Sequence, residues 1–301
     1  MKEINCTVCS ADDYRHWHQV GEYTLVQCKN CGFIYVNPRP TAEELKETYS
    51  EDYYQSFDML DWDKKTSYFE EIISQIKPFV NKGRLLEIGC AMGYFLDTAR
   101  QHGFDCEAVE FSQWASNYAR EERGLKVFTG NLLEAKLTDN AFDLIASWEV
   151  LEHVIDLREY FAEIKRILKP GGWLAFSLPN IDSLVGYFKN DVELMPQFHF
   201  SHFSPKTLKR FLEQYDFKIK YLKTTKVISW KTYLSYLGDR LGLSWQSLAQ
   251  SNILLKLIKL VPAIIWDILA VRLLANVLDL VFSMTNRNDR MIVIAQLANA
   301  E

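Results

Sequence analysis

From Arg84 onward, short apolar runs alternate with stretches that carry a helical pattern of apolar and polar residues. The short runs predict buried strands, and the stretches between them predict helices. The expected strands are Leu85–Ile88, Cys106–Glu110, Lys126–Phe128, Phe142–Ser147 and Trp173–Ser177. The expected helices are Tyr94–His102, Gln113–Arg123 and Leu157–Leu168, and Lys169-Pro170-Gly171-Gly172 ends the last of them. This alternation predicts an α/β domain whose parallel sheet is covered by helices on both faces.

Four of the six cysteines form two closely spaced pairs near the N-terminus. Cys6 and Cys9 form one C-x-x-C pair, and Cys28 and Cys31 form the second. This spacing is typical of a zinc ribbon, in which each pair lies on a tight turn and four thiolates complete a tetrahedral shell. We therefore expect a small zinc-ribbon-like module over residues 1–40. Its zinc ion would be structural, because a closed shell leaves no position open for chemistry.

The ribbon is expected to end at two prolines in residues 36–40, which mark a linker. Thr41 and Glu44 fit a capping box that opens a short helix. The aromatic and acidic stretch Tyr49–Trp62 follows, and it either packs onto the main domain or forms a lid over a ligand. We therefore expect residues 41–82 to form linker or lid helices.

A glycine-rich turn follows the first strand of the main domain. Gly89 and Gly93 enclose a tight strand-to-helix turn with the small residue Ala91 between them, so the backbone can approach a ligand closely. The turn departs from the G-x-G-x-x-G pattern of dinucleotide sites. Glu110 ends the next strand about twenty residues later, where a carboxylate can accept both hydroxyls of a ribose.

The turn is one of four segments that occur in order between Gly83 and Phe217, namely residues 87–93, 109–112, 142–145 and 168–172. In sequence and spacing they resemble the motifs of class I S-adenosylmethionine-dependent methyltransferases. The resemblance implies a doubly wound, Rossmann-like sheet of seven strands and S-adenosylmethionine as cofactor. Two positions differ mildly from the usual motifs: Ala91 replaces the middle glycine, and Asn131 stands where an aspartate is common.

By this resemblance, nine residues form the cofactor site. Glu87 and Gly89 would lie near the methionine moiety, and Glu110 would hold the ribose. Asn131 and Leu132 would flank the adenine. The remaining expected contacts are Ala91 and Gly93 in the turn, Phe111 in the second motif and Trp148 at the end of the fourth strand.

The segment Trp148–Val154 is expected to face the transferred methyl group, because open α/β sheets bind ligands at the carboxyl ends of their strands. On a helical turn, Glu149, Glu152 and His153 would lie on one side and form a divalent-metal half-site. The segment resembles the E-x-x-E-H stretch of ubiquinone-pathway and small-RNA 2′-O-methyltransferases, in which a metal assists the acceptor hydroxyl. The same stretch is largely structural in metal-free members of the superfamily.

A second histidine-rich segment, Phe198–Ser204, follows the fifth strand, where relatives often have a loop over the acceptor pocket. An imidazole with a pKa near neutrality suits the removal of a hydroxyl proton. We therefore expect His153, His199 and Glu149 to be the catalytic residues; the alternative for His153 and His199 is a structural role in packing or capping the loop. We expect His202 to be structural.

Two more strands are expected at Phe217–Leu222 and Arg290–Gln296, where the implied fold would pair them. Residues 226–289 would then form a helical insert before the last strand. Its apolar run from Asn252 to Phe282 is interrupted by charged residues, so it does not form a clean membrane-spanning helix. The apolar face it leaves must pack within the protein, in a homodimer or on a membrane surface. The expected domains are 1–40, 41–82, 83–225, 226–289 and 290–301.

The net charge of −5 in 301 residues disfavours a nucleic acid as partner, because such proteins usually carry a basic stripe. The N-terminus has no apolar core of the signal-peptide kind, so we expect a cytoplasmic protein, with membrane association left open by the insert. The expected function is methylation of a small-molecule, glycan or lipid-like acceptor, with oxygen favoured over carbon or nitrogen as the methylated atom. The alternatives are an RNA methyltransferase, a sugar C-methyltransferase and a non-catalytic scaffold that binds the cofactor.

Overall fold

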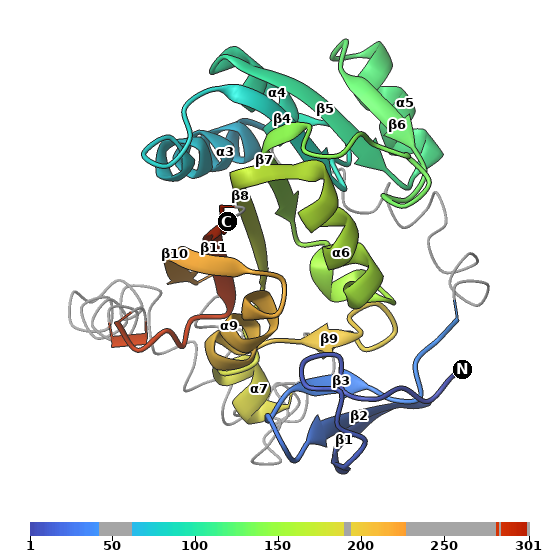
Figure 1. Ribbon diagram of the computed structural model, residues 1–301. Coiled ribbons are helices and arrows are strands. Elements are labelled where there is room, and N and C mark those ends of the chain that lie inside the picture. Colours follow the sequence, from blue (N-terminus) through green and yellow to red (C-terminus); the bar gives the residue numbers. More distant parts are fainter. Residues whose placement is uncertain (42–61, 190–193, 227–280, 283, 300–301) are drawn as a thin grey trace, which may run out of the picture. The chain divides into compact units, whose positions relative to one another are not determined.

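The computed structural model describes residues 1–41, 62–189, 194–226, 281–282 and 284–299 (Figure 1). Glu44 of the expected capping box, almost all of the aromatic stretch 49–62 and almost all of the apolar run 252–282 lie outside these residues. The expectations of a lid, a homodimer and a membrane contact therefore remain predictions. No helix in the described part of the chain is long and apolar enough to cross a membrane.

The main sheet has seven strands, which confirms the number expected from the sequence. The strand order is β10-β11-β8-β7-β4-β5-β6. Neighbours among β4, β5, β6, β7 and β8 run parallel. The strands are β4 (Gly83–Ile88), β5 (Phe104–Glu110), β6 (Lys126–Thr129), β7 (Phe142–Trp148), β8 (Leu168–Pro179), β10 (Phe217–Thr225) and β11 (Arg290–Leu297). The sixth and seventh expected strands are β10 and β11, and they are neighbours as predicted.

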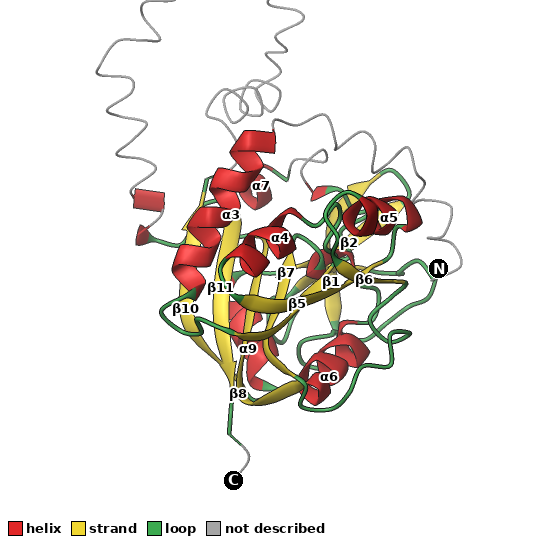
Figure 2. Ribbon diagram, turned by 90° about the horizontal axis from the view of Figure 1, so that it is seen from above, coloured by secondary structure: helices red, strands yellow, loops and turns green. Residues whose placement is uncertain are grey.

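Helices cover both faces of this sheet, as Figure 2 shows. Helices α3 (Trp62–Ile76), α4 (Tyr94–Gln101) and α5 (Gln113–Glu121) contribute to one apolar core against the strands. Helices α6 (Leu157–Ile167) and α9 (Pro205–Glu213) lie on the opposite face, where Phe161 and Phe211 pack edge to face. This layering places the carboxyl ends of the parallel strands at one edge, where open α/β sheets bind ligands.

Helix α3 belongs to the core of the domain, which differs from our expectation of linker or lid helices over 41–82. Ile72, Ile73 and Ile76 are buried in the main core, and Phe69 packs edge to face on Phe95 of α4. The apolar residues of α3 recur every three or four positions, so an amphipathic helix buries them on one side.

Strand β8 begins earlier than predicted. It starts at Leu168 instead of Trp173, because Phe142 pairs with Leu168 before an irregularity in the register. The segment 168–172 ends α6 as expected, but it continues directly as strand.

The chain divides into two compact units. The first comprises residues 1–178, 196–222 and 292–301, and the second comprises 179–195 and 223–291. The second unit thus combines the predicted insert with residues 179–195, which we had expected in the core. Its described part includes α7 (Leu184–Phe188). The amide of Asn180 joins its segments by donating to the carbonyls of Asn286 and Asn288, at 2.9 and 2.7 Å.

The N-terminal cysteines lie in a second sheet, of four strands, with the order β1-β2-β3-β9. The first three are β1 (Tyr14–Val20), β2 (Tyr23–Cys28) and β3 (Ile34–Val36). The fourth, β9 (Ser201–His202), comes from the loop before α9 and pairs antiparallel with β3 (Figure 1). The module expected over residues 1–40 therefore lacks one of its strands, because the ribbon sheet includes a strand from the histidine-rich loop.

Aromatic rings continue this connection from the ribbon into the main domain. Phe33 contacts Phe203, with ring centroids 4.8 Å apart, and Phe203 contacts Phe211 of α9 at 5.5 Å. All three side chains are buried. The ribbon thus shares an apolar core with the helix layer that contains α6 and α9.

Candidate cofactor and acceptor site

The glycine turn has the backbone geometry that its sequence predicts. Gly89, Ala91 and Gly93 all have left-handed backbones, with φ angles of 73°, 46° and 78°. A Cβ atom at Gly89 would lie 2.5 Å from Cγ2 of Val150, so any larger residue would collide there. This close approach also shows that the segment after β7 packs directly against the turn.

The carboxylate of Glu110 lies against the same turn. Its Oε2 accepts a hydrogen bond from the amide of Ala91 at 2.7 Å, and its Oε1 accepts one from the amide of Ser112 at 2.8 Å. Burial raises the pKa of Glu110, while these amides oppose the rise by stabilising the charged form. The amide of Phe111 also bonds this carboxylate, so three amides use three of its about four acceptor positions. At least one position therefore stays open to a hydroxyl donor of a ligand.

Glu87 is the second-last residue of β4, just before the turn, and is 2% exposed. Its Oε2 has no hydrogen-bond partner among the described residues. Burial, followed by the nearby charge of Glu110, raises the pKa of Glu87 well above its usual value. A buried carboxyl group with an unused oxygen is suited to receive a cationic donor from a ligand.

The residues expected near the adenine lie at the end of the neighbouring strand β6. The amide of Gly130 donates to the carbonyl of Glu110 at 2.9 Å, which brings the two strand ends together. Asn131 exchanges hydrogen bonds with Glu134, whereas Leu132 is completely buried. Phe111 is 48% exposed and offers an apolar surface beside Glu110.

Trp148 and Glu149 mark the end of β7. The ring of Trp148 packs on Phe95 of α4, with centroids 4.9 Å apart. Glu149 has a left-handed backbone, with φ of 55°, and its Oε1 accepts a hydrogen bond from the hydroxyl of Ser177 at 2.6 Å. Glu149 therefore lies outside the short 3-10 helix η1 (Leu151–His153), which begins two residues later.

The structure gathers Glu152, His153 and His199, with one ligand atom from each within 4.8 Å of the others. We name these three residues the acid–histidine cluster. Of the expected set, Glu152 and His153 belong to this group, whereas Glu149 does not, since it lies before the short helix η1. The rings of His153 and His199 meet edge to face, with centroids 4.7 Å apart. The amide of Phe200 also donates to the carbonyl of Glu152 at 2.8 Å, which joins the two segments.

The surroundings of both histidines in the cluster favour the neutral imidazole. Burial lowers the pKa of His153 to about 4, although a hydrogen bond from its ring to the carbonyl of Phe198 opposes the shift. Burial and the neighbouring imidazoles lower the pKa of His199 well below its usual value. His202 lies in β9 and donates to the carbonyl of His199. It is 5% exposed, which agrees with the structural role expected for it.

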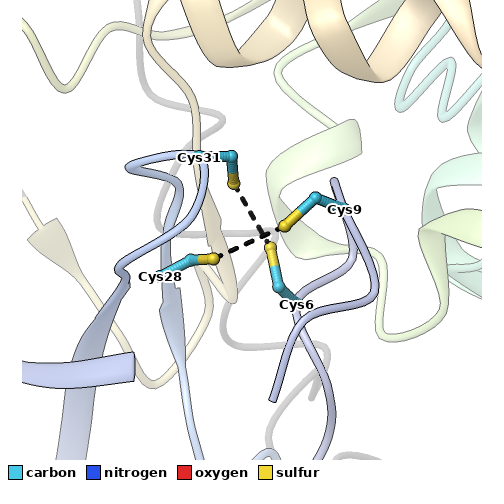
Figure 3. Close-up of side chains that lie close together, drawn as sticks. All are labelled: Cys6, Cys9, Cys28 and Cys31. Carbon is cyan, nitrogen blue, oxygen red and sulfur yellow. Dashed lines mark hydrogen bonds between the residues drawn. The ribbon is translucent and has the colours of Figure 1, made fainter. Parts of the chain in front are cut away.

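The four N-terminal cysteines converge on one point from two turns (Figure 3). The Sγ atoms of Cys6 and Cys31 lie 3.5 Å apart, as do those of Cys9 and Cys28. All four Sγ atoms lie within 4.8 Å of one another. Each pair is held by a turn, in which Ser10 donates to the carbonyl of Cys6 and Gly32 donates to that of Cys28.

One buried residue that contacts the histidine-rich loop was not predicted from the sequence. Arg39 lies in the segment that we expected to be a proline-marked linker, yet it is 2% exposed and is hydrogen-bonded to the histidine-rich loop. A charged residue between two prolines gives no signal of burial in the sequence.

A family model described as a methyltransferase domain matches residues 61–222, which include the glycine turn, Glu110 and the acid–histidine cluster. The chain belongs to this methyltransferase family. The matched residues begin at α3, in agreement with the packing of that helix into the core of the methyltransferase domain.

Two relatives match part of the methyltransferase domain. A protein of Mycolicibacterium smegmatis, named as a probable S-adenosylmethionine-dependent methyltransferase, is 33% identical over 101 residues. The match covers 32% of this chain and 38% of that protein. The ubiquinone biosynthesis O-methyltransferase of Bordetella avium is 29% identical over 116 residues, covering 36% of this chain and 48% of that protein. The match thus spans less than half the length of each relative.

A solved structure shares the fold. The S-adenosylmethionine-dependent methyltransferase of Mesorhizobium loti aligns with a TM-score of 0.50 at 18% identity. The alignment covers 78% of this chain and 100% of that chain. Together with the family match, it confirms the expected class I methyltransferase fold of the domain.

Proposed function

We propose that this protein transfers the methyl group of S-adenosylmethionine to a hydroxyl oxygen of a small-molecule, glycan or lipid-like acceptor. Membership of the methyltransferase family supports the reaction, and the acid–histidine cluster supports oxygen as the methylated atom. The ubiquinone biosynthesis O-methyltransferase among the relatives is consistent with this choice.

The residues at the glycine turn fit S-adenosylmethionine. Glu87 Oε2 is buried and has no partner among the described residues, so it can receive the cationic methionine moiety. Glu110 retains at least one acceptor position, which can receive a ribose hydroxyl.

The observation that carries the proposal is the position of the acid–histidine cluster beside the cofactor turn. Val150 contacts Gly89 of the turn and immediately precedes η1, which contains two of the three cluster residues. An acceptor bound at the cluster would therefore lie at the edge of the sheet where the methyl group is presented. Bound S-adenosylmethionine supplies a methyl group that is already strongly electrophilic, so alignment contributes much of the rate.

The protein must also remove the proton of the acceptor hydroxyl. As the oxygen forms its bond to the methyl carbon, the bond from that carbon to sulfur breaks and the hydroxyl proton leaves. A neutral imidazole of His153 or His199 can take this proton. With a pKa of about 4, however, His153 is a weak base for an ordinary hydroxyl.

The cluster also fits a divalent cation, which would be held by Glu152, His153 and His199. Neutral imidazole is the form that binds a metal, and the low pKa values of both histidines favour it. Two ligand atoms on one cation at about 2.1 Å are at most about 4.2 Å apart, so the observed limit of 4.8 Å requires only small side-chain rotations. A bound cation would lower the pKa of the acceptor hydroxyl, so that a weak base suffices.

We further propose that the four cysteines hold a structural zinc ion. In a tetrahedral shell with Zn–S bonds of about 2.3 Å, neighbouring sulfurs lie about 3.8 Å apart. The pairs at 3.5 Å and the limit of 4.8 Å for all four are close to this geometry. The four thiolates leave no open coordination position, so this zinc would stabilise the ribbon without taking part in the reaction.

The test combines binding with turnover. Calorimetric titration with S-adenosylmethionine, and separately with NAD, measures cofactor preference; we expect binding of the first only. A methyl-labelled cofactor is then incubated with phenols, sugar hydroxyls, an isoprenoid-linked phenol and a structured RNA. Label transferred to a hydroxyl acceptor, together with release of S-adenosylhomocysteine, supports the proposal.

Other results identify the alternatives. Label found on a sugar carbon or on RNA would show that the acceptor class is different and that the cofactor is the proposed one. Cofactor binding without product from any acceptor would favour a scaffold, and a folded protein that binds no S-adenosylmethionine would refute the proposal. Metal dependence is measured by adding Mg²⁺ or Mn²⁺ after mild chelation that leaves zinc in place.

A further inference from the structure

Arg39 lies at the junction between the ribbon and the methyltransferase domain. Its side chain is 2% exposed, and its backbone forms an isolated antiparallel bridge with Lys2. The Nη1 atom donates to the carbonyl of Ile155 at 2.5 Å. The Nη2 atom donates to the carbonyl of Phe200 at 3.0 Å and to the hydroxyl of Ser201 at 3.3 Å.

These acceptors flank the two histidines of the acid–histidine cluster. Ile155 follows His153 by two residues in the segment between η1 and α6. Phe200 and Ser201 directly follow His199 in the loop that continues into β9. One guanidinium group therefore joins the two chain segments that carry the cluster.

We propose that Arg39 is a positioning residue for methyl transfer, through which the ribbon sets the spacing of His153 and His199. This inference rests on the proposed function for its effect on turnover, but its effect on the histidines can be observed independently. Arg39 does not touch the reacting atoms; it acts through the backbone on both sides of the cluster.

The chemistry of the side chain explains why arginine is needed. A guanidinium group presents several donors in a planar fork, which can bond acceptors on two segments at once. A lysine ammonium at the same site is a single charged point on a flexible stem and cannot reproduce the fork. Burial lowers the pKa of Arg39 to about 10, so the group remains a full hydrogen-bond donor near neutral pH.

A second arginine provides a matched control, because it joins the ribbon to the domain away from the cluster. Arg158 of α6 donates to the carbonyls of Thr7 and Cys6, at 3.2 and 2.7 Å, and to the hydroxyl of Ser10 at 2.9 Å. Like Arg39, it bridges the two parts of the first unit. Unlike Arg39, its side chain donates, among the described residues, only to the turn that carries the first cysteine pair.

The experiment compares Arg39→Met, Arg39→Lys and Arg158→Met in the full-length protein. The first readout is the set of ring resonances in protein labelled at its six histidines, measured without added cofactor and assigned with single histidine variants. We expect Arg39→Met to shift the resonances of His153 and His199, and Arg158→Met to leave both unchanged. Both methionine variants should lower the thermal unfolding temperature, because each loses buried or shared hydrogen bonds.

The second readout is turnover. Arg39→Met should reduce kcat about 10- to 100-fold, the cost of a displacement of about 1 Å, while the Kd for S-adenosylmethionine stays within about twofold. Arg39→Lys should lie between Arg39→Met and wild type, and Arg158→Met should retain kcat. If Arg39→Met does not fold, Arg39→Lys is judged by the same two readouts.

The inference is overturned if Arg39→Met leaves both the histidine resonances and kcat unchanged. The same holds for Arg39→Lys if it alone folds. Arg39 would then be a stabilising residue only. An equal loss of kcat in Arg158→Met would also overturn it, since any weakening of the ribbon would then have the same effect. If the wild-type protein methylates none of the acceptors, the proposed function fails, and the resonances alone decide the role of Arg39.

Discussion

The amide of Ala91 donates to Oε2 of Glu110 across 2.7 Å, which joins the glycine turn after β4 to the end of β5. The second oxygen of Glu110 accepts from the amide of Ser112, so the carboxylate orders two backbone segments at once. The residue that would hold the ribose thus also fixes the shape of the turn that would receive the rest of the cofactor. Cofactor affinity and local order should therefore respond together when Glu110 changes.

Replacing Glu110 with Gln should weaken S-adenosylmethionine binding about 10- to 100-fold, because a hydrogen bond to a charged group contributes about 1.5–3 kcal/mol. The glutamine also places its NH₂ group against one of the two amide donors, so the turn loses a hydrogen bond. Calorimetric titration measures the affinity. Glu107→Gln is the control, because Glu107 lies on the same strand but pairs with Arg84 and Lys126. Equal affinities in all three proteins would contradict the assignment of Glu110.

Glu87→Gln should stabilise the protein without cofactor at neutral pH. The folded state raises the pKa of Glu87 well above the unfolded value of about 4.3. The folded protein therefore holds the proton more tightly, and wild-type stability falls as the pH rises from the unfolded pKa through the folded pKa. Glutamine removes this dependence. It should also weaken binding of the cationic cofactor.

Urea unfolding at about pH 5 and about pH 8 measures this effect as the difference in unfolding free energy between variant and wild type. The difference should be larger at the higher pH. Glu107→Gln should show the opposite sign, because ion pairs with Lys126 and Arg84 lower the pKa of Glu107 in the folded state. Its stabilising contribution is present above the unfolded pKa and is lost on acidification. A pH-independent advantage for Glu87→Gln would argue against burial of its charge as the cause.

The cofactor half of the site could be predicted from the sequence because its residues are close together along the chain. Gly89, Ala91 and Gly93 lie within one turn, and Glu110 ends the strand that pairs with the strand before this turn. A parallel sheet places successive strand ends at the same edge, so local pattern and fold class together locate these residues. The identity of Ala91 as an unusual residue was visible in the same way, and its backbone shows why a glycine is common there.

Ala91→Gly should increase the unfolding free energy by about 0.5–1 kcal/mol, because Ala91 has a left-handed backbone that costs less for glycine. Its side chain is exposed, so little packing is lost. Chemical denaturation measures the change. Ala115→Gly, in the buried face of α5, is the matched substitution and should instead destabilise by about 1 kcal/mol or more. Destabilisation by both would show that the backbone of residue 91 relaxes without strain.

The acceptor half of the site could not be predicted to the same extent, because its residues are distant in sequence. His199 lies close to Glu152 and His153 in a loop that runs into β9, and β9 pairs with Ile34 and Tyr35 of the ribbon sheet. A two-residue strand gives no periodic signal. The prediction of Glu149 as a cluster member assumed a regular helical turn. Glu149 instead has a left-handed backbone and lies before a short 3-10 helix, so it is not in the group, which contains His199.

His199→Gln should weaken Mn²⁺ binding at the acid–histidine cluster about tenfold or more, since it removes one of three ligands. Electron paramagnetic resonance of free Mn²⁺ measures the bound fraction in protein whose zinc site is filled. His16→Gln is the matched control, because His16 is exposed on β1 and lies outside the cluster. If both variants bind Mn²⁺ as wild type does, the cluster is not a metal site. An imidazole of the cluster would then have to remove the proton directly, as a base.

Cys9→Ser should release the zinc ion and lower the thermal unfolding temperature by about 10 °C or more, because the free energy of zinc binding is also folding free energy. The loss should extend beyond the ribbon, since β9 pairs with β3 and Phe33 packs on Phe203. Elemental analysis measures the zinc content, and hydrogen exchange measures protection of the amides in residues 198–204. Cys106→Ser is the control, because Cys106 lies on β5 outside the four-cysteine group. Loss of zinc with full protection of this loop would mean that the ribbon folds, and holds the histidine-rich loop, without its metal.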